Sequence, residues 1–335
     1  MKKGWKLILS IYGCILIMTV ILLSIFGNYQ RKMAKQDLGV IDDDIDYKYH
    51  YVFISGQKNV SFWNGIYKAA KERGKELGIY VEQLGSLMTE GYSIEEQLEI
   101  AIASKVDGIM IEPNGEEEVI QLINKAGENN IPVVTLLEDA ANTNRISFIG
   151  VSSYDQGRVI GNQIIELVKE DPSVRNVTVL TNEGKNESAQ EMVYGAILEQ
   201  VKSLNLQTNI LAINGDSIFG AAEDIRNIIM EEEAPDLLIC LNPSDTLAAY
   251  QGVVDYNKVG KVKIIGFYDT ELIPSAIEKR IVQSAVQING AQIGIYGVEA
   301  IHEYINNNRV SEFFPVDIQM VTETIQSDRL EEVSE

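Results

Sequence analysis

The feature that most constrains this chain is an alternation, from residue 51 onward, of short runs rich in β-branched residues with longer segments of helical periodicity. In the first half, the apolar runs lie at 51–55, 79–84, 108–112, 132–137 and 146–150, and helical segments lie at 62–77, 94–104 and 116–129. This alternation predicts parallel strands that are joined by crossover helices.

The second half of the chain repeats the pattern. Its strand-like runs lie at 176–181, 209–213, 236–241, 263–267 and 281–287, and its helical segments lie at 156–169, 188–203, 221–233, 247–256 and just before residue 280. Two similar halves predict an α/β protein with two doubly wound parallel-sheet lobes. Ligands of such sheets bind beyond the carboxyl ends of the strands, so residues that directly follow a strand are the candidates for a site.

Signatures of catalysis and of cofactor binding are missing from the sequence. It contains neither a G-x-x-x-x-G-K-[ST] phosphate loop nor a G-x-S-x-G nucleophile turn. His50 and His302 are its two histidines, and neither belongs to a metal-binding motif. The glycines in GAQIGIYG at 290–297 have the wrong spacing for a dinucleotide fingerprint and are typical of a helix packed closely on a sheet. We therefore expect no enzyme, no cofactor and no metal site.

The charge and the cysteines of the chain exclude two further classes. All 49 acidic residues lie beyond residue 36, together with 22 of the 28 basic residues. So acidic a surface repels phosphate backbones, which argues against nucleic-acid binding. Cys14 and Cys240 are the two cysteines, and they do not suggest a disulfide framework.

An uncharged apolar run occupies residues 7–26, behind Lys2, Lys3 and Lys6. At ~1.5 Å per residue it spans roughly the 30 Å hydrocarbon layer of a membrane. It is longer than the ~7 to 15 apolar residues of a cleavable signal and ends without an A-x-A site. We therefore expect residues 1–27 to form a retained signal anchor with one transmembrane helix.

A lipid-attached Cys14 is the alternative for this segment, since Gly13 precedes it. A lipid-attachment cysteine closes its apolar run, however, whereas this run continues well past Cys14. Residues 28–48 are polar and contain the acidic stretch IDDDID, whose apolar content is too low for independent folding. We interpret them as a linker between the membrane and the lobes.

Several short sequence segments, in their order and spacing, resemble those of the type 1 periplasmic sugar-binding family, which includes ribose- and galactose-binding proteins. They are Phe62-Trp63, IPVVTL at 131–136, ISFIGVSSYDQG at 146–157, LNPSDTLA at 241–248 and IIGFYD at 264–269. The likeness covers about residues 51–322. It implies two lobes joined by a three-segment hinge, with crossovers near 152–154, near Gln287 and after a helix that ends at about Arg309.

This resemblance also implies a division of the chain. The first lobe comprises 49–153 and 288–314, the second comprises 154–287 and 315–325, and 326–335 is a tail. The return to the first lobe after Gln287 rests on the resemblance alone, because periodicity does not indicate it.

The resemblance places ligand-binding residues as well. Phe62 and Trp63 match an aromatic pair that stacks on the apolar face of a sugar. A hydrophobic staple at the start of the helix is the alternative role for one of the two. Asn242 matches a cleft asparagine whose amide donates and accepts hydrogen bonds, and capping the next helix is its alternative role. Gln287 matches a glutamine at the hinge.

Two further positions carry over less directly. Asp269, rather than its neighbour Tyr268, matches a carboxylate that binds sugar hydroxyls, since a charged acceptor binds them more strongly than a phenol does. Asn59 precedes the aromatic pair, although the nearest family asparagine aligns better with Val60. We include Asn59 and Asp269 among the candidate ligand-binding residues.

The departures from the family pattern bear on the ligand. Leu137 and Glu138 stand where the pentose and hexose binders commonly have Asp-Arg, Gln190 stands where an arginine is expected, and Glu112 replaces an asparagine. Loss of two arginines removes forked donors for ring oxygens and hydroxyls, which argues against ribose itself. If Glu112, Glu138 and Asp269 face the site, a neutral polyol or an amine-bearing ligand is favoured over an acid or a phosphate.

The expected function is that of an extracytoplasmic solute-binding protein, anchored in the cytoplasmic membrane, which closes around a sugar or polyol. Its partner is an ABC-type importer permease or, alternatively, a sensor kinase or chemoreceptor. A sugar-responsive transcription regulator shares this two-lobed domain, but this chain has an apolar span and an acidic linker where a DNA-binding helix pair is required. An enzyme on the same fold lacks a catalytic set in the sequence.

Overall fold

The computed structural model of the chain describes residues 46–56, 61–84, 91–183, 187–214, 218–268 and 272–323. They form two compact units. The first runs through Ser147 and includes Gly297–Val310, and the second comprises Phe148–Tyr296 and the segment from Ser311 onward. The expected anchor at 7–26 lies outside the described residues. Within the described residues, no helix is both long and apolar enough to cross a bilayer.

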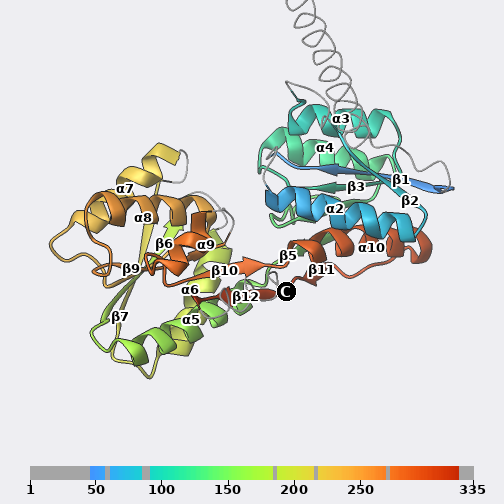
Figure 1. Ribbon diagram of the computed structural model, residues 1–335. Helices are drawn as coiled ribbons and strands as arrows, with labels where there is room; N and C mark the ends of the chain where they lie inside the picture. Colours follow the sequence, from blue (N-terminus) through green and yellow to red (C-terminus); the bar gives the residue numbers. More distant parts are fainter. Residues whose placement is uncertain are drawn as a thin grey trace, which may run out of the picture. The chain divides into compact units, whose positions relative to one another are not determined.

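The first sheet contains six strands in the order β11-β5-β4-β3-β1-β2. They are β1 (Tyr49–Ile54), β2 (Ile79–Gln83), β3 (Gly108–Ile111), β4 (Val133–Leu136), β5 (Ser147–Gly150) and β11 (Phe313–Pro315). β1 pairs in parallel with β2 and β3, as do β3 with β4 and β5 with β11. Figure 1 shows the sheet between two pairs of helices, α3 (Ile94–Ala103) with α4 (Glu117–Glu128), and α2 (Ser61–Glu76) with α10 (Gly290–Asn307).

The strands of this sheet are buried on both faces, which explains why their apolar runs are unbroken rather than alternating. β3 and β4 are buried at every position. On one face, Ile109 of β3 packs in a cluster with Leu98 of α3 and Ile123 of α4. The core of the first unit is therefore a helix-sheet-helix sandwich, as the alternation of elements predicts.

Helix α10 approaches the other face closely. A Cβ atom added to Gly297 would lie 2.9 Å from the sulfur of Met110 on β3 and 3.5 Å from Leu136 on β4. A side chain at this position would push the helix away from the sheet. The packing role expected for the glycines at 290–297 is thus found at Gly297.

The second sheet has the strand order β12-β10-β9-β8-β6-β7. Its strands are β6 (Asn176–Asn182), β7 (Gln207–Ile213), β8 (Leu237–Ile239), β9 (Lys263–Phe267), β10 (Ser284–Ile288) and β12 (Ile318–Val321). Its helices are α5 (Ser153–Glu170), α6 (Glu187–Val201), α7 (Ile218–Met230), α8 (Pro243–Asp255) and α9 (Leu272–Glu278).

Neighbouring residues along the second sheet's strands enter different clusters, because side chains alternate between the faces of a sheet. Leu238 and Ile264 belong to the cluster with α7, α8 and α9. Leu237 and Ile265 belong to the cluster with α5 and α6. The same strands therefore contribute to both clusters, and each face of the sheet has its own core.

The prediction of two α/β lobes with parallel sheets is confirmed, and one antiparallel pair is added at the edge of the second sheet. β12 runs antiparallel to β10, with Gln319 opposite Gln287, so the second sheet is mixed. Strand β11 was not predicted, because a run of three residues is too short to show periodicity. The helix expected from Gln156 begins instead at Ser153, where the Ser152 hydroxyl accepts a hydrogen bond from the Asp155 amide at 3.3 Å.

The end of α3 provides a stability prediction. Lys105 has φ +53°, and the backbone amides of Lys105 and Val106 donate to Ile102 and Ala101 in a Schellman motif. Glycine adopts this conformation without a Cβ penalty, so Lys105→Gly is expected to raise the free energy of unfolding by about 0.5–1 kcal/mol. Glu99→Gly, at an exposed position inside α3, should lower it by a similar amount. Denaturant titration of both variants checks this, and a loss of stability in Lys105→Gly would contradict it.

Candidate functional site

Two asparagines meet at the carboxyl ends of neighbouring strands in the second sheet. Asn182 is the last residue of β6, and Asn242 follows β8 as the N-cap of α8. The Asn242 side-chain nitrogen donates to Oδ1 of Asn182 at 2.8 Å and to Oδ2 of Asp245 at 2.5 Å. Its oxygen accepts a hydrogen bond from the Asp245 backbone amide at 2.9 Å. Asn242 thus caps the helix and also joins two strand ends.

Gln190 of α6 holds the end of β6 in place. Its side-chain oxygen accepts from the Asn182 backbone amide at 2.7 Å, and its nitrogen donates to the Asn182 carbonyl at 3.2 Å. These two hydrogen bonds hold the backbone of Asn182 from the side of α6. The structure therefore assigns Gln190 to the support of Asn182.

The first turn of α8 buries polar groups behind this network. Asp245 is 2% exposed and Thr246 is fully buried. The Thr246 hydroxyl donates to the Asn242 carbonyl at 2.7 Å and accepts from the Phe267 amide at 2.9 Å, which ties α8 to the end of β9. Burial, and secondarily the charge of Asp245, raises the pKa of the Cys240 thiol well above its ordinary value. Cys240 is accordingly an inert core residue.

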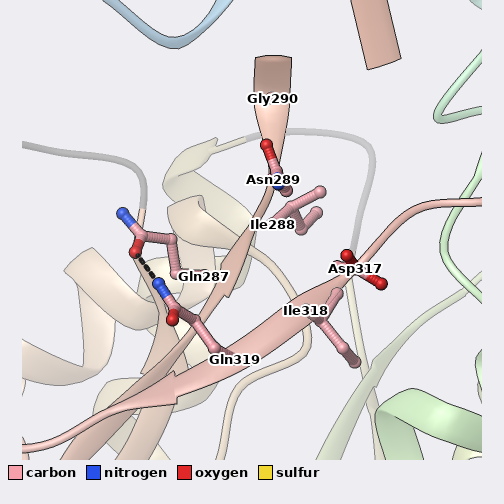
Figure 2. A pocket seen from close by; sticks show the side chains of 7 residues that line it. All are labelled: Gln287, Ile288, Asn289, Gly290, Asp317, Ile318 and Gln319. Atoms are coloured by element: carbon pink, nitrogen blue, oxygen red, sulfur yellow. Dashed lines mark hydrogen bonds between the residues drawn. The ribbon is translucent and has the colours of Figure 1, made fainter. Parts of the chain in front are cut away.

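Gln287 lies in a separate pocket of the second unit. Gln319 of β12 donates from Nε2 to Oε1 of Gln287 at 2.7 Å, as the dashed line in Figure 2 shows. The pocket has a volume of about 590 Å³. It is lined by Gln287, Ile288, Asn289, Gly290, Asp317, Ile318 and Gln319.

Phe62 and Trp63 occupy different environments in the first turn of α2. Trp63 is 3% exposed, and its ring lies 6.0 Å from that of Phe53 on β1. Phe62 is half-buried, with its ring 5.9 Å from that of Trp63. Trp63 is therefore a core residue, whereas Phe62 keeps a partly accessible ring. The staple role considered for one of the pair stays a prediction.

The two carboxylates of the first unit follow adjacent strands. Glu112 is half-buried directly after β3, and its amide donates to the Ile54 carbonyl at 3.0 Å. Glu138 is exposed after β4, and its amide donates to the Leu136 carbonyl at 2.7 Å across Leu137. Leu137 has φ +61°, so these residues form a strained γ-turn. Strain of this kind is often found where a chain is shaped for a ligand.

The structure brings together Gln190 and Asn242, through Asn182, and it places Gln287 beside Gln319. Asn59 and Asp269 lie outside the described residues. Sequence reasoning missed Asn182, Asp245 and Gln319. For Asn182 a signal was present, because a polar residue that directly follows the buried run at 177–181 meets the criterion for a strand-end candidate. Among the described residues, no group of three or more histidine, cysteine or carboxylate side chains is arranged to hold a metal ion.

These arrangements define a class of protein, namely two doubly wound α/β units whose strand ends carry hydrogen-bonding side chains. The profile of the periplasmic binding protein domain matches residues 51–309. The chain belongs to this family.

Individual relatives are distant. The ribose import binding protein of Haemophilus influenzae is 23% identical over 229 residues, covering 64% of this chain and 72% of the relative. The glucose-galactose binding protein GanP of Geobacillus stearothermophilus has a TM-score of 0.69 at 23% identity, covering 82% of this chain and 98% of GanP. XylFII has a TM-score of 0.63 at 28% identity, covering 82% and 99%, and its complex with LytSN has also been solved.

Proposed function

We propose that this chain is an extracytoplasmic solute-binding protein that closes its two lobes around a sugar or polyol and presents the closed form to an ABC-type importer. The observation that supports this proposal is the pair of amide side chains, Asn182 and Asn242, at the strand ends of the second sheet, with Gln190 of α6 holding the backbone of Asn182. Amides of this kind donate to and accept from hydroxyl groups. The lobes are taken as 49–153 with 288–314, and 154–287 with 315–325.

The other lobe would supply apolar contact and charge. Phe62 offers a partly accessible ring for the C–H face of a sugar, and the ring of Trp63 packs against the Phe62 ring. Glu112 and Glu138 follow neighbouring strands, and the chain has a net charge of −21. Negative potential at the site favours a neutral or amine-bearing ligand over a sugar acid or phosphate.

Binding without covalent chemistry suffices for this function. Each lobe holds part of the site, so a ligand that contacts both stabilises the closed form relative to the open one. The closed shape then serves as the signal for a partner. Family membership supports a position outside the cytoplasm, and we propose that residues 7–26 anchor the chain in the membrane.

The alternative partner is a sensor kinase or chemoreceptor, with this chain as the ligand-sensing module. The likeness to XylFII, which has been solved in complex with LytSN, is the observation that supports a partner other than an importer. The names of two relatives, a ribose import binding protein and the sugar-binding protein of a sugar ABC transporter, favour the importer. Co-purification of the membrane-embedded chain with a permease, as against a kinase or receptor, distinguishes the two.

A thermal-shift screen of the full chain in mild detergent tests the binding function. The panel contains neutral sugars, polyols, amino sugars, sugar phosphates and amino acids. A ligand at ~100 times its Kd adds roughly 2.7 kcal/mol to the free energy of unfolding, which gives a clear rise in Tm. We expect this rise with one class of neutral or amino sugar. Tight binding of a sugar phosphate or sugar acid would contradict the proposed ligand class, and no rise with any compound would contradict the function.

A further inference from the structure

We infer that Asn182 is a ligand-binding residue that presents its side-chain NH₂ group as a hydrogen-bond donor to an oxygen acceptor of the bound sugar. This inference rests on the proposed function, and it names a residue that the family resemblance did not. Asn182 ends β6 and is half-buried. Its side chain is fixed in orientation by a chain of hydrogen bonds that ends at a buried carboxylate.

Asp245 determines the direction of that chain. A carboxylate accepts hydrogen bonds, so the Asn242 atom at 2.5 Å from Oδ2 of Asp245 must be the amide nitrogen. The same assignment follows independently from the Asn242 oxygen, because that atom accepts from the Asp245 backbone amide. The orientation of the Asn242 amide is therefore determined at both of its ends.

The orientation of Asn182 follows from that of Asn242. The Asn242 nitrogen donates its second hydrogen to Asn182, so the Asn182 atom facing it must be Oδ1, at 2.8 Å. An amide group is planar, with its oxygen and nitrogen at separate corners. The Asn182 nitrogen consequently points away from Asn242, and it has no hydrogen-bond partner among the described residues.

The backbone of Asn182 is held equally firmly. Gln190 contacts both its amide and its carbonyl group. A donor whose backbone and side-chain oxygen are both fixed loses little conformational entropy when it binds a ligand. Asn242 has both of its N–H groups engaged within the protein, so it can offer a ligand only an acceptor. Asn182 thus provides the donor that Asn242 cannot.

The sharpest test is Asn182→Asp. Aspartate retains an oxygen for Asn242 and leaves the Gln190 contacts, which are to the backbone, in place. It replaces the outward-facing donor by a charged acceptor. Asn209→Asp on β7 is the matched control, because it makes the same change in charge at an asparagine outside the amide network. Asn209 pairs with Thr178 of β6, which lies four residues before Asn182.

Isothermal titration of the full chain in detergent uses paired sugars, D-glucose with D-glucosamine and D-galactose with D-galactosamine, together with D-ribose and D-xylose. Asn182→Asp is expected to weaken binding of the best neutral sugar at least about tenfold, since a donor is lost and an unpaired charge is placed against the ligand. The matched amino sugar should lose less, because its ammonium group can pair with the new carboxylate. Asn209→Asp should bind as the unmodified chain does.

Other outcomes overturn the inference. If the Kd of Asn182→Asp for the neutral sugar is within about threefold of that of the unmodified chain, Asn182 does not contact the ligand. The proposed function would stand in that case. Failure of the unmodified chain to bind any of these sugars, together with no rise in Tm across the thermal-shift panel, would refute both. If Asn182→Asp does not fold, Asn182→Ala is tested in its place. Its affinity for the neutral sugar is expected to fall about three- to tenfold, and an unchanged affinity would overturn the inference.

Discussion

Substitution of Gly157 by alanine is expected to lower the free energy of unfolding of the second unit by about 2–3 kcal/mol. Gly157 lies on α5 where that helix crosses α6. An added Cβ atom would lie 2.3 Å from the backbone oxygen of Val193 and 2.6 Å from Cβ of Ala196. The first of these neighbours is backbone, which cannot rotate away. The two helices must separate, and the cluster behind them, which includes Ile160 and Ile197, loses close contact.

Gly195 on α6 is the matched control. Nothing lies within 4 Å of the position of its Cβ atom, so Gly195→Ala keeps the packing and gains helix propensity. We expect it to stabilise the unit by about 0.5–1 kcal/mol. Hydrogen exchange of peptides from α5 and α6 measures both effects, with faster exchange in Gly157→Ala and slower exchange in Gly195→Ala. Equal stabilisation by the two substitutions would show that the close helix crossing is not present.

Most of the helices and strands were predictable because the burial of each one produces a pattern of apolar residues within its own segment. β9 was expected at 263–267 and was found there, and it is buried at every position after its first residue. The stripe of Trp63, Ile66 and Ala70 in α2 has helical spacing, and it contains Trp63 but not Phe62. That spacing already indicates which of the two aromatic residues belongs to the core.

The features that were missed depend on contacts between distant parts of the chain. Asn182 and Asn242 are separated by 60 residues, and Gln287 and Gln319 by 32. No local pattern indicates which strand ends will be neighbours, because the sheet order places β8 directly beside β6, although β7 intervenes in sequence. The antiparallel direction of β12 depends likewise on where the chain re-enters the second sheet, which periodicity does not show.

Substitution of Asn242 by alanine is expected to lower the free energy of unfolding by about 2–4 kcal/mol and to weaken sugar binding more than tenfold. The helix loses its N-cap, which costs about 1 kcal/mol. The buried carboxylate of Asp245 loses a donor, which costs about 1–3 kcal/mol. Asn182 loses the contact that fixes its orientation, so the proposed ligand donor is no longer held in place. Urea denaturation and isothermal titration of the same sample measure the two effects.

Two companion variants separate these contributions. Asn242→Ser can still accept from the Asp245 amide, so it should recover the capping energy of about 1 kcal/mol but not the binding, because serine has a single O–H donor in place of two N–H groups. Combining Asn242→Ala with Asp245→Asn removes the buried charge, so the pair should be more stable than Asn242→Ala alone, since an uncharged amide is less costly to leave with fewer partners. If the double variant is instead less stable than Asn242→Ala, the Asp245 carboxylate is held mainly by other groups. The amide network would then not depend on it for its direction.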